Sequence, residues 1–208
     1  MDFSSLSIFV ITCLAINLIP GPDVIYIVTN TMKGRVQDGL KAAMGLGVGY
    51  VFHTAAACLG LSAIILSSAL LFTVIKFFGA AYLCYLGIKC LMSMYLGQSN
   101  IGAKSKQEYK GNVFVQGIVV SVLNPKVALF FLSFLPQFID QNSENVTWSL
   151  LIYGLTFCCL ATLCNLVYAV AGGWVFSKAK STRYTRILEG VSGVMLIGLA
   201  GKITLDGR

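Results

Sequence analysis

Two long apolar stretches of the chain are each interrupted near the middle by proline and by one ionisable residue. The first contains Pro-Gly-Pro-Asp at residues 20–23, and the second contains Asn-Pro-Lys at residues 124–126. Proline inside a helix removes a backbone donor and clashes with the preceding turn, so each stretch is predicted to be a broken helix. Inside a bilayer, such backbone is tolerated only where it is buried in protein or lines a cavity. Because a charge at that depth is costly, Asp23 and Lys126 mark the expected functional site.

The composition indicates an integral membrane protein. Of the 208 residues, 57% are hydrophobic and 11% are charged, whereas about a quarter of the residues in a soluble domain are charged. Six apolar stretches approach or exceed the ~20 residues that cross a bilayer. They lie near residues 6–30, 41–66, 70–95, 113–138, 147–175 and 186–205. We expect an all-α membrane protein with six transmembrane helices, the first and fourth broken. The first stretch lacks the basic start of a cleavable signal peptide, so we expect it to remain as a span.

The basic residues predict the orientation of these spans. The net charge of +7 is concentrated in the connections between spans one and two, three and four, and five and six. The residues are Lys33, Arg35 and Lys41, then Lys104, Lys106 and Lys110, then Lys178, Lys180, Arg183 and Arg186. Positively charged connections stay in the cytoplasm, so both termini are expected outside. We interpret the basic surplus as this topology signal and expect no nucleic-acid partner.

The two halves of the chain align at their breaks. A shift of 103 residues places Pro22 on Pro125 and Asp23 on Lys126. Each half holds three expected spans, so the second half must enter the membrane from the opposite side. We therefore predict one transmembrane domain, 1–208, built as an inverted 3+3 repeat of residues 1–96 and 113–208, joined by a basic cytoplasmic linker, 97–112. Two unrelated proline kinks are the alternative.

The breaks offer groups for binding a charged ligand. A half-helix begins after each proline, and its first amides lack partners and carry partial positive charge. Lys126 with free amides would receive an anion, and Asp23 would receive a cation or a proton. Together they match a zwitterion. The expected binding residues are Gly21, Pro22, Asp23, Asn124, Pro125 and Lys126. Two simpler interpretations stay open: Asp23 stabilises a helix start, or Asp23 and Lys126 form a static bridge.

Other polar residues within the spans are candidates for a proton relay or a cavity lining. His53 is the only histidine and could pass a proton, or it could be a hydrogen-bonded packing residue. Asp23, Asn17 and Asn30 are further candidates for the same relay or for the cavity lining. Asn165 also lies in an expected span. Interhelical hydrogen bonding is the alternative for the asparagines. Gly45-x-Gly47-x-Gly49 follows no predicted strand, so it indicates close helix packing and not a dinucleotide site.

No pattern in the chain indicates an enzyme. Seven cysteines lie inside apolar stretches without a C-x-x-C spacing, so we expect apolar packing residues and not disulfides or metal ligands. G-x-S-x-G, H-E-x-x-H and a phosphate loop are missing from the sequence. We expect no catalytic residues, no metal set and no cofactor.

The broken stretches and their surroundings resemble a known family. The relevant segments are "PGPDVIYIVTNTMKGRVQDGLKAAMGLGVGYVFHTAAACLGLSA", "FFGAAYLCYLGIKCLMS" and "VVSVLNPKVALFFLSFLPQFID". With them, nearly the whole chain resembles the LysE/RhtB family of bacterial amino-acid exporters, of the homoserine, threonine and leucine efflux type. The family's proline motifs map onto residues 20–23 and 124–126.

This resemblance implies a six-span secondary active transporter in the bacterial inner membrane, and the basic connections predict that both termini lie in the periplasm. The implied activity is efflux of amino acids or close derivatives, driven by the proton motive force. The expected partners are an amino-acid substrate, protons and membrane lipid, and a homo-oligomer stays open. A small-ion or metal permease is the alternative, although the single histidine and the missing acidic cluster argue against it. Paired charges at mid-depth argue against a membrane scaffold.

Overall fold

The protein is helical throughout the part that the structure describes. The computed structural model describes residues 3–18, 21–61, 69–96, 111–139 and 145–177, with positions 186, 190–191, 193–194, 196–198, 200–201 and 204 of the last stretch. No strand occurs among these residues, so the all-α expectation is confirmed. Pro20, the basic connections at 97–110 and 178–185, and much of the expected sixth span lie outside the described residues.

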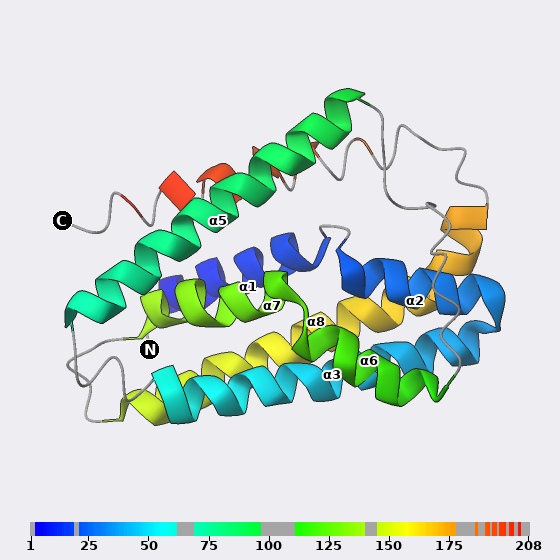
Figure 1. The fold of residues 1–208 in the computed structure, drawn as a ribbon, viewed down its shortest axis with the longest axis horizontal. Coiled ribbons are helices and arrows are strands. Elements are labelled where there is room, and N and C mark those ends of the chain that lie inside the picture. Colours follow the sequence, from blue (N-terminus) through cyan, green and yellow to red (C-terminus); the bar gives the residue numbers. More distant parts are fainter. Residues whose placement is uncertain are drawn as a thin grey trace.

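Each half contains a broken pair of helices followed by a long helix (Figure 1). The first half contains α1 (Phe3–Leu18), α2 (Pro22–Lys33), α3 (Val36–Ala56), the π-helical turn η1 (Ala57–Leu61) and α5 (Ala69–Leu96). The second half contains α6 (Val113–Val122), α7 (Pro125–Leu129), the π-helical turn η2 (Phe130–Phe134), the 3-10 turn η3 (Leu135–Phe138) and α8 (Val146–Ser177).

Two described helices are long and apolar enough to cross a membrane, Val36–Gly60 and Val146–Ala171. Two bent pairs bring the number to four if each pair forms one span. The pair Ser5–Leu18 and Pro22–Met32 is bent by 53°, and the pair Val113–Val122 and Pro125–Phe138 is bent by 45°. Six spans, and their arrangement as an inverted repeat, stay predictions.

The second helix of each bent pair begins at a proline. Pro22 follows the N-cap Gly21, and Pro125 follows the N-cap Asn124. Proline suits this first helical position because its missing N–H would have had no helical acceptor and its φ is already helical. It cannot continue the preceding helix, which explains why α1 and α6 end just before.

Helix α3 packs closely against α6 and α8 through its glycines. A Cβ added to Gly45 would collide with the Phe114 carbonyl oxygen, and one added to Gly49 would meet the Ser121 side chain. On the other side, a Cβ at Gly47 would lie 2.8 Å from Thr162 Oγ1. The interpretation of these glycines as a close-packing surface is therefore confirmed.

An aromatic cluster joins the two halves beside the breaks. Phe130 of η2 stacks on Phe157 of α8 at 4.4 Å between ring centroids. Phe9 of α1 meets the edge of Tyr153 of α8 at 4.8 Å. All four rings are buried. Both breaks lie near the middle of the long axis (Figure 1), so this packing holds α1 and α8 around them.

Candidate functional site

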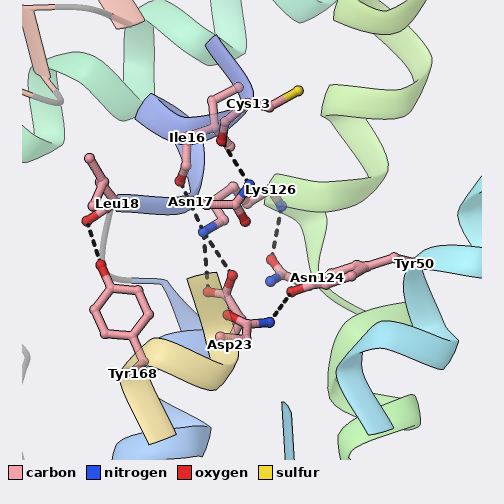
Figure 2. Close-up of polar contacts among 10 residues, drawn as sticks. Cys13, Ile16, Asn17, Leu18, Asp23, Tyr50, Asn124, Lys126 and Tyr168 are labelled. Atoms are coloured by element: carbon pink, nitrogen blue, oxygen red, sulfur yellow. Dashed lines mark hydrogen bonds and ion pairs between the residues drawn. The ribbon is translucent and has the colours of Figure 1, made fainter. Parts of the chain in front are cut away.

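Asp23 and Lys126 form a buried ion pair between the two breaks (Figure 2). Lys126 Nζ lies 2.9 Å from Asp23 Oδ2 and 3.1 Å from Oδ1, so one ammonium bonds both carboxylate oxygens. The side chains are 7% and 1% exposed. These are the two ionisable residues that the sequence placed at the expected site, and the structure brings them into direct contact.

The two charges occupy the same position in their helices. Each residue directly follows the proline that begins its helix, Asp23 in α2 and Lys126 in α7. An acidic residue is favourable in the first turn of a helix, whereas a cation is unfavourable there. Asp23 therefore has two stabilising partners, the helix start and Lys126, while Lys126 depends on its partners across the break.

Gly21 leaves the space that the ion pair fills. A Cβ at this position would lie 2.6 Å from Asp23 Oδ1 and 3.0 Å from Lys126 Nζ. Both distances are shorter than normal contacts with carbon, so an alanine would displace the carboxylate or the ammonium. Gly21, expected as a binding residue, thus contributes by having no side chain.

Asn124 caps α7 and occupies amides that the sequence analysis expected to be free. Its Oδ1 accepts from Lys126 N at 3.0 Å. Its backbone oxygen accepts from Val127 N and Ala128 N at 3.1 and 3.0 Å. Since Pro125 has no N–H, these bonds leave no free amide among residues 125–128. At this second break the donors are therefore side chains, whereas no side chain caps α2 at the first break.

Two buried polar atoms at the second break have no hydrogen-bond partner among the described residues, Asn124 Nδ2 and Ser121 Oγ. Asn124 is 1% exposed and Ser121 is fully buried. A buried polar group without a partner is costly and calls for an explanation. Asn124 Nδ2 belongs to the residue that precedes Pro125 and Lys126, so this unbonded donor lies at the second break, and its role in binding stays a prediction.

Tyr50 and Asn165 form a second buried polar group beside the ion pair. Asn165 Nδ2 of α8 donates to Tyr50 Oη of α3 at 2.9 Å. Figure 2 shows the Tyr50 hydroxyl directed toward the break. The interhelical bonding expected for Asn165 is confirmed. Tyr50 was not singled out in the sequence because one tyrosine in an apolar helix gives no signal without a partner.

The remaining candidates are the residues expected for a proton relay or a cavity lining. Asn17 Nδ2 donates to Cys13 O at 2.7 Å, and Asn30 Nδ2 donates to Tyr26 O at 2.8 Å, so both bond within their own helices. Asn30 is seven residues beyond Asp23, which is about 10 Å along α2. His53 stacks on Phe131 at 5.6 Å. A relay through these residues stays a prediction.

The geometry suits exchange of charged partners. The closed pair satisfies both charges without water, because each is the counterion of the other. A molecule with a carboxylate and an ammonium could replace it charge for charge, with Asn124 Nδ2 as an added donor. Such a replacement keeps the buried site neutral, which avoids the cost of an uncompensated charge.

Known proteins similar to this chain are membrane proteins and efflux proteins. The chain is 32% identical over 197 residues to the uncharacterized membrane protein YrhP of Bacillus subtilis (strain 168), covering 91% of this chain and 93% of that protein. It is 29% identical over 203 residues to a leucine efflux protein of Enterobacter sp. (strain 638), covering 94% and 92%. A leucine efflux protein of Salmonella typhimurium is 25% identical over 197 residues. No solved structure matches the chain.

The family assignment rests on most of the sequence. The LysE type translocator family matches residues 14–207, which include both proline motifs, the ion pair and α3 and α8. This agrees with the resemblance inferred from the motifs and with the apolar helices of the structure. The chain belongs to the LysE type translocator family.

Proposed function

We propose that this protein is a secondary active transporter that exports amino acids or close derivatives across the bacterial inner membrane. In this proposal the chain crosses the membrane six times as an inverted repeat, with both termini in the periplasm and the linker in the cytoplasm. Lys126 binds the substrate carboxylate, and Asp23 binds the ammonium. The observation that carries the proposal is the buried Asp23–Lys126 ion pair at two opposed helix breaks.

The closed pair corresponds to the empty site. Opening it separates a cation from an anion across the break, and these two charges are complementary to the carboxylate and the ammonium of an amino-acid backbone. An amino acid that enters between them restores both interactions. The relatives named leucine efflux proteins support an apolar amino acid as the first substrate to test.

Asp23 also provides a place for the coupling proton. A buried carboxylate needs a compensating positive charge. Lys126 supplies it in the empty site, and the ammonium supplies it in the loaded site. After substrate leaves and before the pair closes again, a proton is the cation that can neutralise Asp23. Proton entry would then accompany amino-acid exit.

Three molecules with the same side chain test the two-charge requirement. Leucine carries both charges, 4-methylpentanoate carries only the carboxylate, and isoamylamine carries only the ammonium. In inside-out vesicles with an imposed pH gradient, uptake should occur for leucine alone, and the other two should compete poorly. Asp23→Asn and Lys126→Gln should each abolish uptake when uptake is expressed per amount of inserted protein.

Other outcomes separate the alternatives. Leucine uptake that persists after the gradient is collapsed would indicate a facilitator or another coupling ion. Uptake of Mn²⁺ or Zn²⁺ without uptake of any amino acid would favour a metal permease. Wild-type uptake by Lys126→Gln would remove the carboxylate-binding role.

A further inference from the structure

Proline at each break leaves a backbone carbonyl without its helical donor. In an α-helix the carbonyl of one residue accepts from the N–H four residues later. Pro22 and Pro125 have no N–H, so the carbonyls of Leu18 and Ser121 lose that donor. Inside a membrane no water replaces that donor, so a carbonyl left without any donor is destabilising. Each of these carbonyls can therefore accept from a donor elsewhere in the structure.

A side chain from a distant helix donates to each of these carbonyls. Tyr168 Oη lies 3.3 Å from Leu18 O, as Figure 2 shows. His53 Nε2 lies 3.1 Å from Ser121 O, which also accepts from Asn124 N in the turn. A carbonyl oxygen only accepts, so the bond requires His53 to carry its proton on Nε2.

The two donors cross between the halves. His53 belongs to α3, the long helix after the first break, and it serves the second break. Tyr168 belongs to α8, the long helix after the second break, and it serves the first. We propose that His53 and Tyr168 are positioning residues that hold the two broken helices so that Asp23 and Lys126 meet.

Lys126 of the ion pair also lies close to a carbonyl that has lost its helical donor to a proline. Pro20 removes the helical donor of Ile16, and Lys126 Nζ lies 3.4 Å from Ile16 O. Pro20, Pro22 and Pro125 have no N–H to offer the carbonyls of Ile16, Leu18 and Ser121, and each of these carbonyls has a donor from another part of the chain. Losing either positioning bond should shift one broken helix relative to the other and separate Lys126 from Asp23.

Four variants test the positioning role in the purified full-length protein. His53→Phe keeps a ring on Phe131 but removes the donor, whereas His53→Gln keeps an N–H donor and cannot titrate. Tyr168→Phe removes one hydroxyl. Tyr26→Phe is the control at a carbonyl that proline does not affect: Tyr26 Oη lies 2.7 Å from Val113 O and 3.4 Å from Gln116 Oε1, and Val113 O keeps a helical donor in Gly117 N.

We expect His53→Phe and Tyr168→Phe to lower the melting temperature by about 2–4 °C each. His53→Gln should recover most of the loss, and Tyr26→Phe should cost less than Tyr168→Phe despite its shorter bond. Infrared difference spectra provide a second readout that does not depend on transport. In His53→Phe and Tyr168→Phe, Asp23 without its lysine should take a proton and show a carboxylic-acid band. Adding Asp23→Asn should remove the band.

The proposal is overturned if His53→Gln and His53→Phe behave alike in both readouts, or if Tyr168→Phe is indistinguishable from Tyr26→Phe. It is also overturned for His53 if His53→Gln keeps the wild-type melting temperature and spectrum but loses transport as fully as His53→Phe. That last result would identify a proton relay.

Discussion

Neutralising one member of the Asp23–Lys126 pair should destabilise the protein more than neutralising both. The nearest atoms are 2.9 Å apart, and at an effective dielectric constant of about 20 their attraction is about 6 kcal/mol. Removing each charge from water costs several kcal/mol, so the net contribution of the closed pair is small. A single substitution leaves one buried charge uncompensated, at about 3–5 kcal/mol.

Thermal unfolding of four purified proteins measures this difference. They are the wild type, Asp23→Asn, Lys126→Gln and the double variant. For a chain of this length 3–5 kcal/mol corresponds to about 6–20 °C, so each single variant should lose at least that lower value. The double variant should unfold within a few degrees of the wild type. Leucine flux, measured in parallel, should be absent from all three variants.

The two readouts separate a substrate site from a static bridge. Recovered stability with no flux in the double variant supports binding by the two charges. Recovered stability together with recovered flux would mean that the pair only holds the fold. Losses of stability that simply add in the double variant would refute the argument from buried charge.

Three further perturbations test the site and the orientation. Gly21→Ala should lower the melting temperature and abolish flux, since its Cβ would lie 2.6 Å from Asp23 Oδ1; wild-type behaviour in both assays would show that this space is not needed. Exchanging the charges, Asp23→Lys with Lys126→Asp, should leave flux below the wild-type rate, and full flux would show that the two positions are equivalent. Reporter fusions should place Ser99 in the cytoplasm and Ser143 outside, and the reverse would overturn the orientation.

The sequence predicted the residues of the ion pair because the signals are local. Proline, glycine and a single charge inside an apolar stretch are visible in the letters, and the shift of 103 residues places Asp23 opposite Lys126. The close packing of α3 was also predictable, because glycines in an apolar helix allow neighbouring helices to approach.

The partners across helices were not predictable from the sequence. The lost donors at Leu18 and Ser121 follow from counting four residues back from proline. Which side chain replaces them depends on the rotation and crossing of α3 and α8, which only packing decides. The amides after Pro125 are not free as expected, because Asn124 caps the helix; asparagine is among the preferred residues at this position.

The surroundings of the two charges determine how a zwitterion would lie between them. Beside Lys126, Asn124 Nδ2 is a buried donor without a partner among the described residues. Beside Asp23, the carbonyl of Ile16 would lose Lys126 Nζ when the pair opens. A carboxylate needs donors and an ammonium needs acceptors. The carboxylate at Lys126 and Asn124, with the ammonium at Asp23 and Ile16, gives each of these four groups a partner of the matching kind. The reverse orientation would set like charges against each other at both ends. The charges of Asp23 and Lys126 therefore favour one direction of binding, and the donor of Asn124 and the carbonyl of Ile16 favour the same direction.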